Sequence, residues 1–378
     1  MKPLRVLHAP TMVGGVPQEL ARAQREIGLD STSMAFFQTR FGYQADRVLA
    51  TNSVSRLAFE SLRWRFFVDA LRKFDVFHFN AGMSLLPHFE VGRTSRKPRQ
   101  RAFDAYARLF ELRDLPILRR LGKTVFVTFQ GSDIRQGDFC RAHFEITYAN
   151  EFADDIRTRA SDDHKRRIVA MFDRYANGIY AATPDLLRML PPRAKLLPDV
   201  TVDLRDWRPP PPSRNARLLV IHAPSDPRVK GTKYVRDAIE RLRADGVDFD
   251  FELVEGRKRD DARSVYERAD LVVEQVLLGW YSVLATEVMA LGKPVITYIR
   301  EEDLELVTPA MRSELPVIGA RPDTLYTVLK EWLTTKREQL PVVGQRSRAY
   351  VERWHDPLTV AAHTRQAYED ARIPEVHR

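Results

Sequence analysis

The stretch from Leu271 to Thr297 constrains the fold of this chain most, because it reads as a complete strand–helix–strand unit. Its order is an apolar strand, a glycine loop, a run of helix formers and a second apolar strand: Leu271–Val273, Gly279, Val283–Leu291 and Val295–Thr297. Ser282 stands at the expected N-cap of the helix, and Gly292 stands just past its end. Such a unit places free helix amides at the carboxyl end of a parallel strand, a position that attracts phosphate.

Length and composition indicate a soluble protein with two domains. The 378 residues suffice for two full cores, and the 44% hydrophobic and 29% charged residues are ordinary for a soluble chain. The single cysteine, Cys140, excludes an internal disulfide and a multi-cysteine metal cluster. No apolar run approaches the roughly 20 residues of a membrane span, and Met1–Arg5 leads into a strand without a signal-peptide region. We therefore expect a cytoplasmic protein.

The order of the predicted elements gives the fold class. Strands and helices alternate in two halves, with no long all-β stretch, which predicts an α/β protein with two doubly wound sheets. Four consecutive prolines, Pro209–Pro212, form a stiff, extended linker. We place the domain boundary close to it, with one Rossmann-like domain over residues 1–205 and a second over residues 206–345.

The charge is concentrated in the first half of the chain. Residues 1–200 contain 32 Lys and Arg against 22 Asp and Glu, a net charge of +10, whereas residues 201–378 have a net charge of −1. The excess peaks around five basic residues: Arg93, Arg96, Lys97, Arg99 and Arg101. It indicates either an anionic partner, such as a membrane surface or a phosphorylated acceptor, or a merely solvated surface. No recognition helix or stacking motif is evident, so we expect no nucleic acid partner.

Three loops that follow predicted strands are candidate ligand-binding loops. Gly14-Gly15 lies between the first strand and the first helix, where glycine lets backbone approach a ligand, although such a pair is more often simply a turn. Gly131-Ser132-Asp133 forms a polar tip after the apolar strand 123–129, where open α/β sheets place ligand contacts. Lys230-Gly231 follows the strand 218–222, and we interpret this lysine as phosphate-binding rather than only solvated.

The helix half of 271–297 resembles the signature of retaining glycosyltransferases of the glycogen-synthase-like family 4. That signature has a Glu, seven residues, a second Glu, and then roughly Ala-Met-Ala-x-Gly-x-Pro-Val. Residues 287–295 match the later part, with Glu287 as the second Glu, whereas Gly279 stands in place of the first. Lys230 matches the family's lysine that grips the diphosphate. Gln130 replaces the histidine of the family's His-Gly-x-Asp, whose last residue is Asp133.

The resemblance implies the GT-B fold, in which two doubly wound Rossmann-like domains face a central cleft and C-terminal helices, here 346–378, cross back to the first domain. It implies transfer of a sugar from a nucleotide diphosphate sugar to an acceptor hydroxyl with retention, with no cofactor and no metal. Arg228 supplies, by our inference, the positive charge that the family takes from an arginine missing here. The expected residues are, for catalysis, Gln130, Asp133 and Lys230, and, for donor binding, Gly14, Gly15, Arg228, Lys230, Tyr281, Ser282 and Glu287.

The implied partners are a nucleotide-sugar donor and a sugar or lipid-linked acceptor, in cell-surface polysaccharide or glycolipid assembly. The basic first domain adds an anionic membrane surface, which would place the protein peripherally at the inner membrane face. The alternative is a non-catalytic GT-B protein that acts as a binding or membrane-surface module. Two departures from the family support it, since Gly279 has no carboxylate and Gln130 cannot act as an acid or base near neutral pH.

Overall fold

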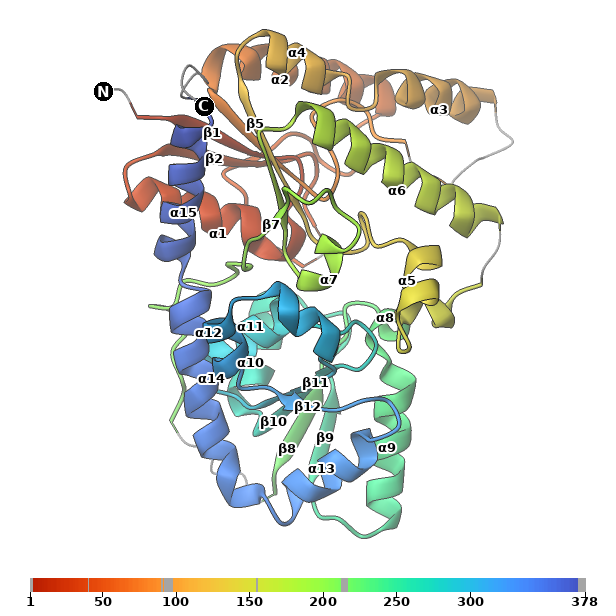
Figure 1. The fold of residues 1–378 in the computed structure, drawn as a ribbon, viewed down its shortest axis with the longest axis vertical. Helices are drawn as coiled ribbons and strands as arrows, with labels where there is room; N and C mark the ends of the chain where they lie inside the picture. Colours follow the sequence, from red (N-terminus) through yellow and green to blue (C-terminus); the bar gives the residue numbers. More distant parts are fainter. Residues whose placement is uncertain are drawn as a thin grey trace.

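The computed structural model describes residues 3–39, 41–89, 91, 98–153, 156–211 and 217–372. Within these ranges the chain forms two entirely parallel β-sheets, each surrounded by helices, which lie in the upper and lower halves of Figure 1. The α/β class and the two doubly wound sheets predicted from the sequence are confirmed.

The described residues of the first half form a seven-stranded sheet of order β3-β2-β1-β4-β5-β6-β7. Its strands are β1 Arg5–Ala9, β2 Asp30–Ala35, β3 Arg47–Val48, β4 Val76–Asn80, β5 Thr124–Phe129, β6 Gly178–Ala181 and β7 Lys195–Leu196. The helices between them are η1 Val13–Gly15, α1 Val16–Glu26, α2 Arg56–Lys73, α3 Pro98–Phe110, α4 Asp114–Arg120, α5 Gly137–His143, η2 Tyr148–Glu151, α6 Ile156–Tyr175 and α7 Pro184–Leu187.

The second half forms, within the described ranges, a five-stranded sheet of order β12-β11-β10-β8-β9. Its strands are β8 Leu219–His222, β9 Asp250–Leu253, β10 Leu271–Gln275, β11 Val295–Thr297 and β12 Ile318–Gly319. Its helices are α8 Pro227–Lys230, α9 Thr232–Ala244, α10 Arg259–Arg268, α11 Val283–Ala290, η3 Glu301–Leu306, α12 Pro309–Glu314, α13 Leu325–Leu333, η4 Arg337–Gln339, α14 Leu340–Trp354 and α15 Pro357–Asp370.

Each sheet is buried on both faces, as expected of parallel strands covered by helices. Neighbouring residues of one strand point to opposite faces, so Val6 and Leu7 of β1 belong to two different hydrophobic clusters. Val272 and Val273 of β10 are divided in the same way between the two clusters of the second sheet. Both faces of a strand must then be apolar, which explains the continuous hydrophobic runs in the sequence.

The last two helices pack on different halves of the molecule. Tyr350 and Val351 of α14 pack into the core of the second sheet, beside α11. Helix α15 lies against α1 of the first half, where the Gln24 amide donates to Thr364 Oγ1 at 2.9 Å (Figure 1). The chain thus returns to its first half at its end.

Some predicted boundaries differ from the structure. From the sequence we expect the second strand over residues 33–37, whereas in the structure it begins at Asp30 and ends at Ala35. Helix α14 begins at Leu340, six residues before the expected start of the C-terminal helices. Pro341 in its first turn favours this start, because its ring fixes a helical φ and the amide hydrogen that it lacks would have no partner within the helix at that position. The proposed boundary near residue 205 falls between β7 and β8.

Three aromatic residues of α2 pack inward, and most of its basic residues lie outward, although Arg63 is buried. Phe59, Phe66 and Phe67 are buried in the core, and Arg65 and Arg72 are exposed. Of the predicted basic peak, Arg99 and Arg101 lie on α3. Arg93, Arg96 and Lys97 lie outside the described residues. In the described part of the chain no helix has both the length and the apolar character needed to span a bilayer.

Candidate functional site

The loop between β10 and α11 brings the two halves of the molecule together. The Gln275 side chain shapes this loop, since its Oε1 accepts from the Leu277 and Leu278 amides at 2.8 and 2.7 Å. The amino end of α11 then meets the glycine pair of the first half. A Cβ added to Gly14, whose φ is +60°, would lie 2.6 Å from Val283 Cγ2. Gly14 is thus needed both for its backbone conformation and for this close contact.

Lys230 and Ser282, two of the predicted donor-binding residues, lie together at the start of α11, and a third residue joins them. Lys230 Nζ lies 2.6 Å from Glu274 Oε1 and donates to Ser282 Oγ at 2.7 Å. Ser282 Oγ in turn donates to Glu274 Oε1 at 2.6 Å, and Thr297 Oγ1 donates to Glu274 Oε2 at 3.2 Å. Ser282 is the N-cap residue, but its side chain makes no capping bond. The first amides of α11 are therefore not capped by this hydroxyl.

Glu274 is not identified as a site residue from the sequence alone. It lies at a register irregularity of β10 and is 0% exposed, and Lys230 is 6% exposed. A charge inside the apolar run that begins at Leu271 was a usable signal, because a buried carboxylate requires a partner. The nature of that partner depends on the packing of α8 against the end of β10, which local sequence patterns do not report.

Glu287 is buried on α11 and is paired with Arg259 of α10. Arg259 Nε lies 2.9 Å from Glu287 Oε1, and its Nη2 donates to the Thr201 carbonyl at 2.6 Å. Burial raises the pKa of Glu287, and the Arg259 charge opposes that rise. The Arg259 guanidinium also stacks on the rings of Tyr43 and Trp207, at 5.4 and 4.9 Å from their centroids.

Arg259 opens onto a cavity of about 660 Å³ between the two halves, which is lined also by Gly15, Tyr43 and Thr201. The predicted Gly15 therefore borders a space of ligand size. The predicted Glu287 does not line this space itself but pairs with Arg259, which does. Sequence reasoning missed Arg259, although it stands at the start of helix α10, which follows strand β9.

Two predicted donor residues direct their side chains elsewhere. The Tyr281 hydroxyl is buried, 3.0 Å from Tyr350 Oη and 2.9 Å from His355 Nε2, so the ring belongs to the core beside α14. Burial raises the pKa of Tyr281 well above its usual range. The Arg228 guanidinium donates to the Glu151 carbonyl of the first half and stacks on Phe152 at 4.0 Å.

Gln130 and Asp133 lie together at the carboxyl end of β5. The Asp133 carboxylate accepts from the backbone amides of Gln130 and Gly131, at 3.1 and 2.6 Å, and thus holds the loop. The Gln130 Oε1 atom is buried and makes no hydrogen bond to the described residues. Gln130 borders a small cavity with Asn80 and Asp199. Burial, with repulsion from Asp133, raises the pKa of Asp199 to about 7.

Arg300 occupies the space beside Gly279, where the family signature has its first glutamate. Gly279 has φ +81°, and a Cβ there would lie 2.5 Å from Arg300 Nη1. Arg300 is buried, forms a 2.6 Å ion pair with Asp303 and stacks on Phe144 at 3.6 Å. A guanidinium from the loop after β11 therefore lies beside the position at which the resembling signature has a carboxylate.

Comparison with solved structures identifies the fold. No protein-family model matches the sequence, and no curated protein matches it. Among solved structures, the chain resembles sucrose-phosphate synthase from Thermosynechococcus elongatus at 12% identity and a TM-score of 0.58, covering 97% of this chain and 98% of that one. It also resembles Anabaena HepE in complex with UDP-glucose, at 12% identity and a TM-score of 0.59, covering 97% and 100%. A glycosyltransferase from Rickettsia africae matches at 11% identity and a TM-score of 0.57, covering 99% and 100%. These are GT-B structures, and the predicted GT-B fold is confirmed.

Proposed function

We propose that this protein is a retaining glycosyltransferase that moves a sugar from a nucleotide diphosphate sugar to an acceptor hydroxyl. One observation carries the proposal: the buried Lys230 ammonium lies at the amino end of α11, where that helix meets the Gly14 loop of the other Rossmann-like half. The structural likeness to HepE, which was solved with UDP-glucose, supports a donor of this class.

Lys230 and the α11 amides are suited to the leaving diphosphate. Negative charge grows on that group as the glycosidic bond breaks, so fixed positive groups aimed at it accelerate the step. Two of the three Lys230 ammonium hydrogens are directed to Glu274 and Ser282, and one remains for phosphate. Because these groups supply the charge, we assign no metal or cofactor to the transfer.

The remaining predicted residues divide between the nucleotide and the reacting sugar. Glu287 would accept from the ribose hydroxyls, with the nucleotide in the cavity that Arg259 and Gly15 border. Gln130 would donate to or accept from a sugar hydroxyl at the acceptor side, while Asp133 positions it through the loop amides. Arg228 would reach the diphosphate only after leaving Glu151, so its contribution depends on a side-chain movement.

Glu287→Gln is expected to raise the donor KM about 10-fold, because a hydrogen bond to a charged acceptor contributes about 1.5–3 kcal/mol. The measurement is release of nucleoside diphosphate from UDP-, GDP-, ADP- and dTDP-sugars, with water as the acceptor where no other is known. Glu267→Gln is the matched control, since Glu267 pairs with Arg263 on the surface of α10 and should leave KM unchanged. Release from none of these donors would contradict the transferase and favour the non-catalytic binding module.

We propose further that the acceptor is a sugar or lipid-linked sugar in cell-surface polysaccharide or glycolipid assembly, reached from an anionic inner membrane face. The outward face of α2 supports this, since its exposed side chains mix apolar and basic types at helical spacing: Leu57, Arg65, Val68 and Arg72. Figure 1 places α2, with α3 and α4, on the side of the first half away from the second.

The protein is expected to co-sediment with phosphatidylcholine vesicles that contain phosphatidylglycerol, and to be released at high salt, because salt screens charges over about 8–10 Å. Arg65→Glu with Arg72→Glu should abolish this binding. The control reverses two exposed arginines seven residues apart on α9 of the other half, Arg236 and Arg243. An equal loss of vesicle binding in both double variants would contradict the assignment of the outward face of α2 as the membrane-binding face. Binding to vesicles without phosphatidylglycerol would contradict it as well.

A further inference from the structure

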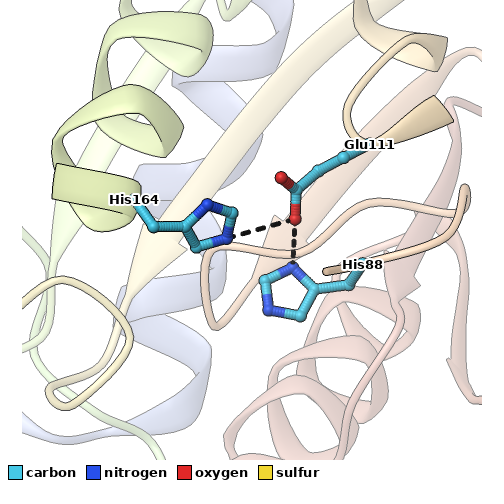
Figure 2. A group of neighbouring side chains, drawn as sticks. All are labelled: His88, Glu111 and His164. Atoms are coloured by element: carbon cyan, nitrogen blue, oxygen red, sulfur yellow. Dashed lines mark ion pairs between the residues drawn. The ribbon is translucent and has the colours of Figure 1, made fainter. Parts of the chain in front are cut away.

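We propose that His88, Glu111 and His164 bind a divalent transition-metal ion, with zinc as the expected ion. The three side chains converge in the first half of the molecule (Figure 2). Their ligand atoms, His88 Nδ1, Glu111 Oε1 and His164 Nε2, all lie within 4.8 Å of one another. The inference concerns a site outside the donor cleft, and it stands whether or not the chain transfers a sugar.

Three separate segments supply the three residues. His88 lies in the loop after β4, Glu111 directly follows α3, and His164 lies on α6. Glu111 Oε1 is 2.9 Å from His88 Nδ1 and 3.3 Å from His164 Nε2. Zinc bonds of about 2.0–2.2 Å in a tetrahedron place ligand atoms about 3.3–3.5 Å apart. An ion therefore fits after small movements of the imidazoles.

Hydrogen bonding does not explain this convergence. Glu111 Oε1 already accepts from the Phe89 backbone amide at 2.9 Å. The two ring nitrogens that face it, on His88 and His164, are buried, and neither makes a hydrogen bond of acceptable geometry to the described residues. Both nitrogens lie at ion-pair distance from Glu111 Oε1, but a buried polar atom that lacks a well-directed hydrogen bond is still costly, about 1–3 kcal/mol. A shared metal ion would satisfy both nitrogens and the carboxylate at once.

The chemistry of the three ligands selects the ion. Imidazole nitrogens with one carboxylate suit zinc and its first-row neighbours, whereas calcium and magnesium prefer oxygen ligands. Two histidines and a glutamate also leave one position of a tetrahedron for water or an added ligand. All three side chains are partly or fully shielded from solvent, which favours a bound ion over a loosely associated one.

The ion would fix one wall of a cavity in the first half of the molecule. His88 also lines a cavity of about 510 Å³ near the ends of β1 and β2, together with Thr11, Arg56 and Phe103. By joining the His88 loop to α6 and to the end of α3, the metal would hold that wall in one conformation. We therefore assign it a structural role beside the cavity and no part in the transfer step.

The test uses the full-length protein, treated with chelator, dialysed, and titrated with Co²⁺ followed by absorbance and with Zn²⁺ followed by elemental analysis. We expect one ion per chain, a tetrahedral Co²⁺ spectrum that zinc abolishes, and a melting temperature that rises with zinc. Glu111→Gln and His164→Gln should each weaken binding at least about 100-fold, since even loss of a supporting residue weakens metal sites by about 10–100-fold. His143→Gln is the control, because His143 is exposed, stacks on Phe139 and hydrogen-bonds the Phe139 carbonyl.

If the unaltered protein binds no stoichiometric ion in these titrations, the proposal is overturned, whatever binding the variants show. Binding that is unchanged in Glu111→Gln overturns it as well. If His164→Gln does not fold, Glu111→Gln still tests the proposal. Glutamine has nearly the same shape as glutamate and can still accept from the Phe89 amide, so we expect this variant to fold. Donor hydrolysis that stays unchanged after chelation, while the melting temperature falls, supports the structural role.

Discussion

Lys230→Met is expected to reduce nucleotide-sugar turnover to background and to destabilise the folded chain by about 3–5 kcal/mol. The destabilisation follows because Glu274, which is 0% exposed, loses its ion-pair partner, and an unpaired buried charge has a cost of this size. The loss of turnover follows because the diphosphate loses the ammonium at the amino end of α11. Steady-state release of nucleoside diphosphate and urea unfolding measure the two effects.

A double variant separates the two roles of the lysine. Lys230→Met with Glu274→Gln removes both charges, and replacement of a whole buried ion pair is often neutral for stability. The amide oxygen of the introduced glutamine can still accept from Ser282, so we expect most of the lost stability to return. Turnover should not return. If the double variant recovers both stability and turnover, Lys230 is a structural residue and its assignment to the diphosphate is wrong.

Gly279→Glu, which introduces the first glutamate of the signature that the chain resembles, is expected to give no gain in turnover and to destabilise the chain by about 2–5 kcal/mol. A non-glycine residue at φ +81° costs about 1–3 kcal/mol, and overpacking against the Arg300 guanidinium costs a similar amount. Arg300 cannot easily move away, because it pairs with Asp303 and stacks on Phe144.

Alanine substitutions provide the matched comparison for Gly279. Gly256 has φ +68° and nothing within 4 Å of an added Cβ, so Gly256→Ala measures the backbone cost alone. Gly279→Ala adds the contact with Arg300 and should destabilise more, as measured by urea unfolding. Equal destabilisation by the two substitutions would show that the Arg300 side chain moves at little cost and does not exclude a side chain at position 279.

The elements around α11 were predictable because their signals are local. Gly292 ends the helix, the apolar runs mark β10 and β11, and glycine is required where Gly14 meets Val283. The strands β7 and β12 could not be predicted in this way, since each has two residues. Strands this short take their conformation from pairing with a neighbour.

The chemistry of the site was predictable only in part, because each functional side chain depends on a partner far away in the sequence. Lys230 and Glu287 were recognised by type and spacing, but Glu274 and Arg259 lie 44 and 28 residues away from them. Tyr281 shows the opposite case. It lies in the predicted loop, but loop residues have no periodicity that would indicate whether a side chain faces the cleft or the core. Here the Tyr281 ring packs against Tyr350 in the core.

The measurement that tests the nucleotide-sugar site most directly is calorimetric titration of nucleoside diphosphates and nucleotide sugars into the unaltered protein and into the Lys230→Met, Glu274→Gln double variant. Urea unfolding must first show that both proteins are fully folded under the conditions of the titration. We predict that at least one diphosphate nucleotide binds the unaltered protein and that the double variant binds it at least about 10-fold more weakly, the equivalent of one lost charge-assisted hydrogen bond. Equal affinity in the two proteins, or no binding by either, would contradict the account.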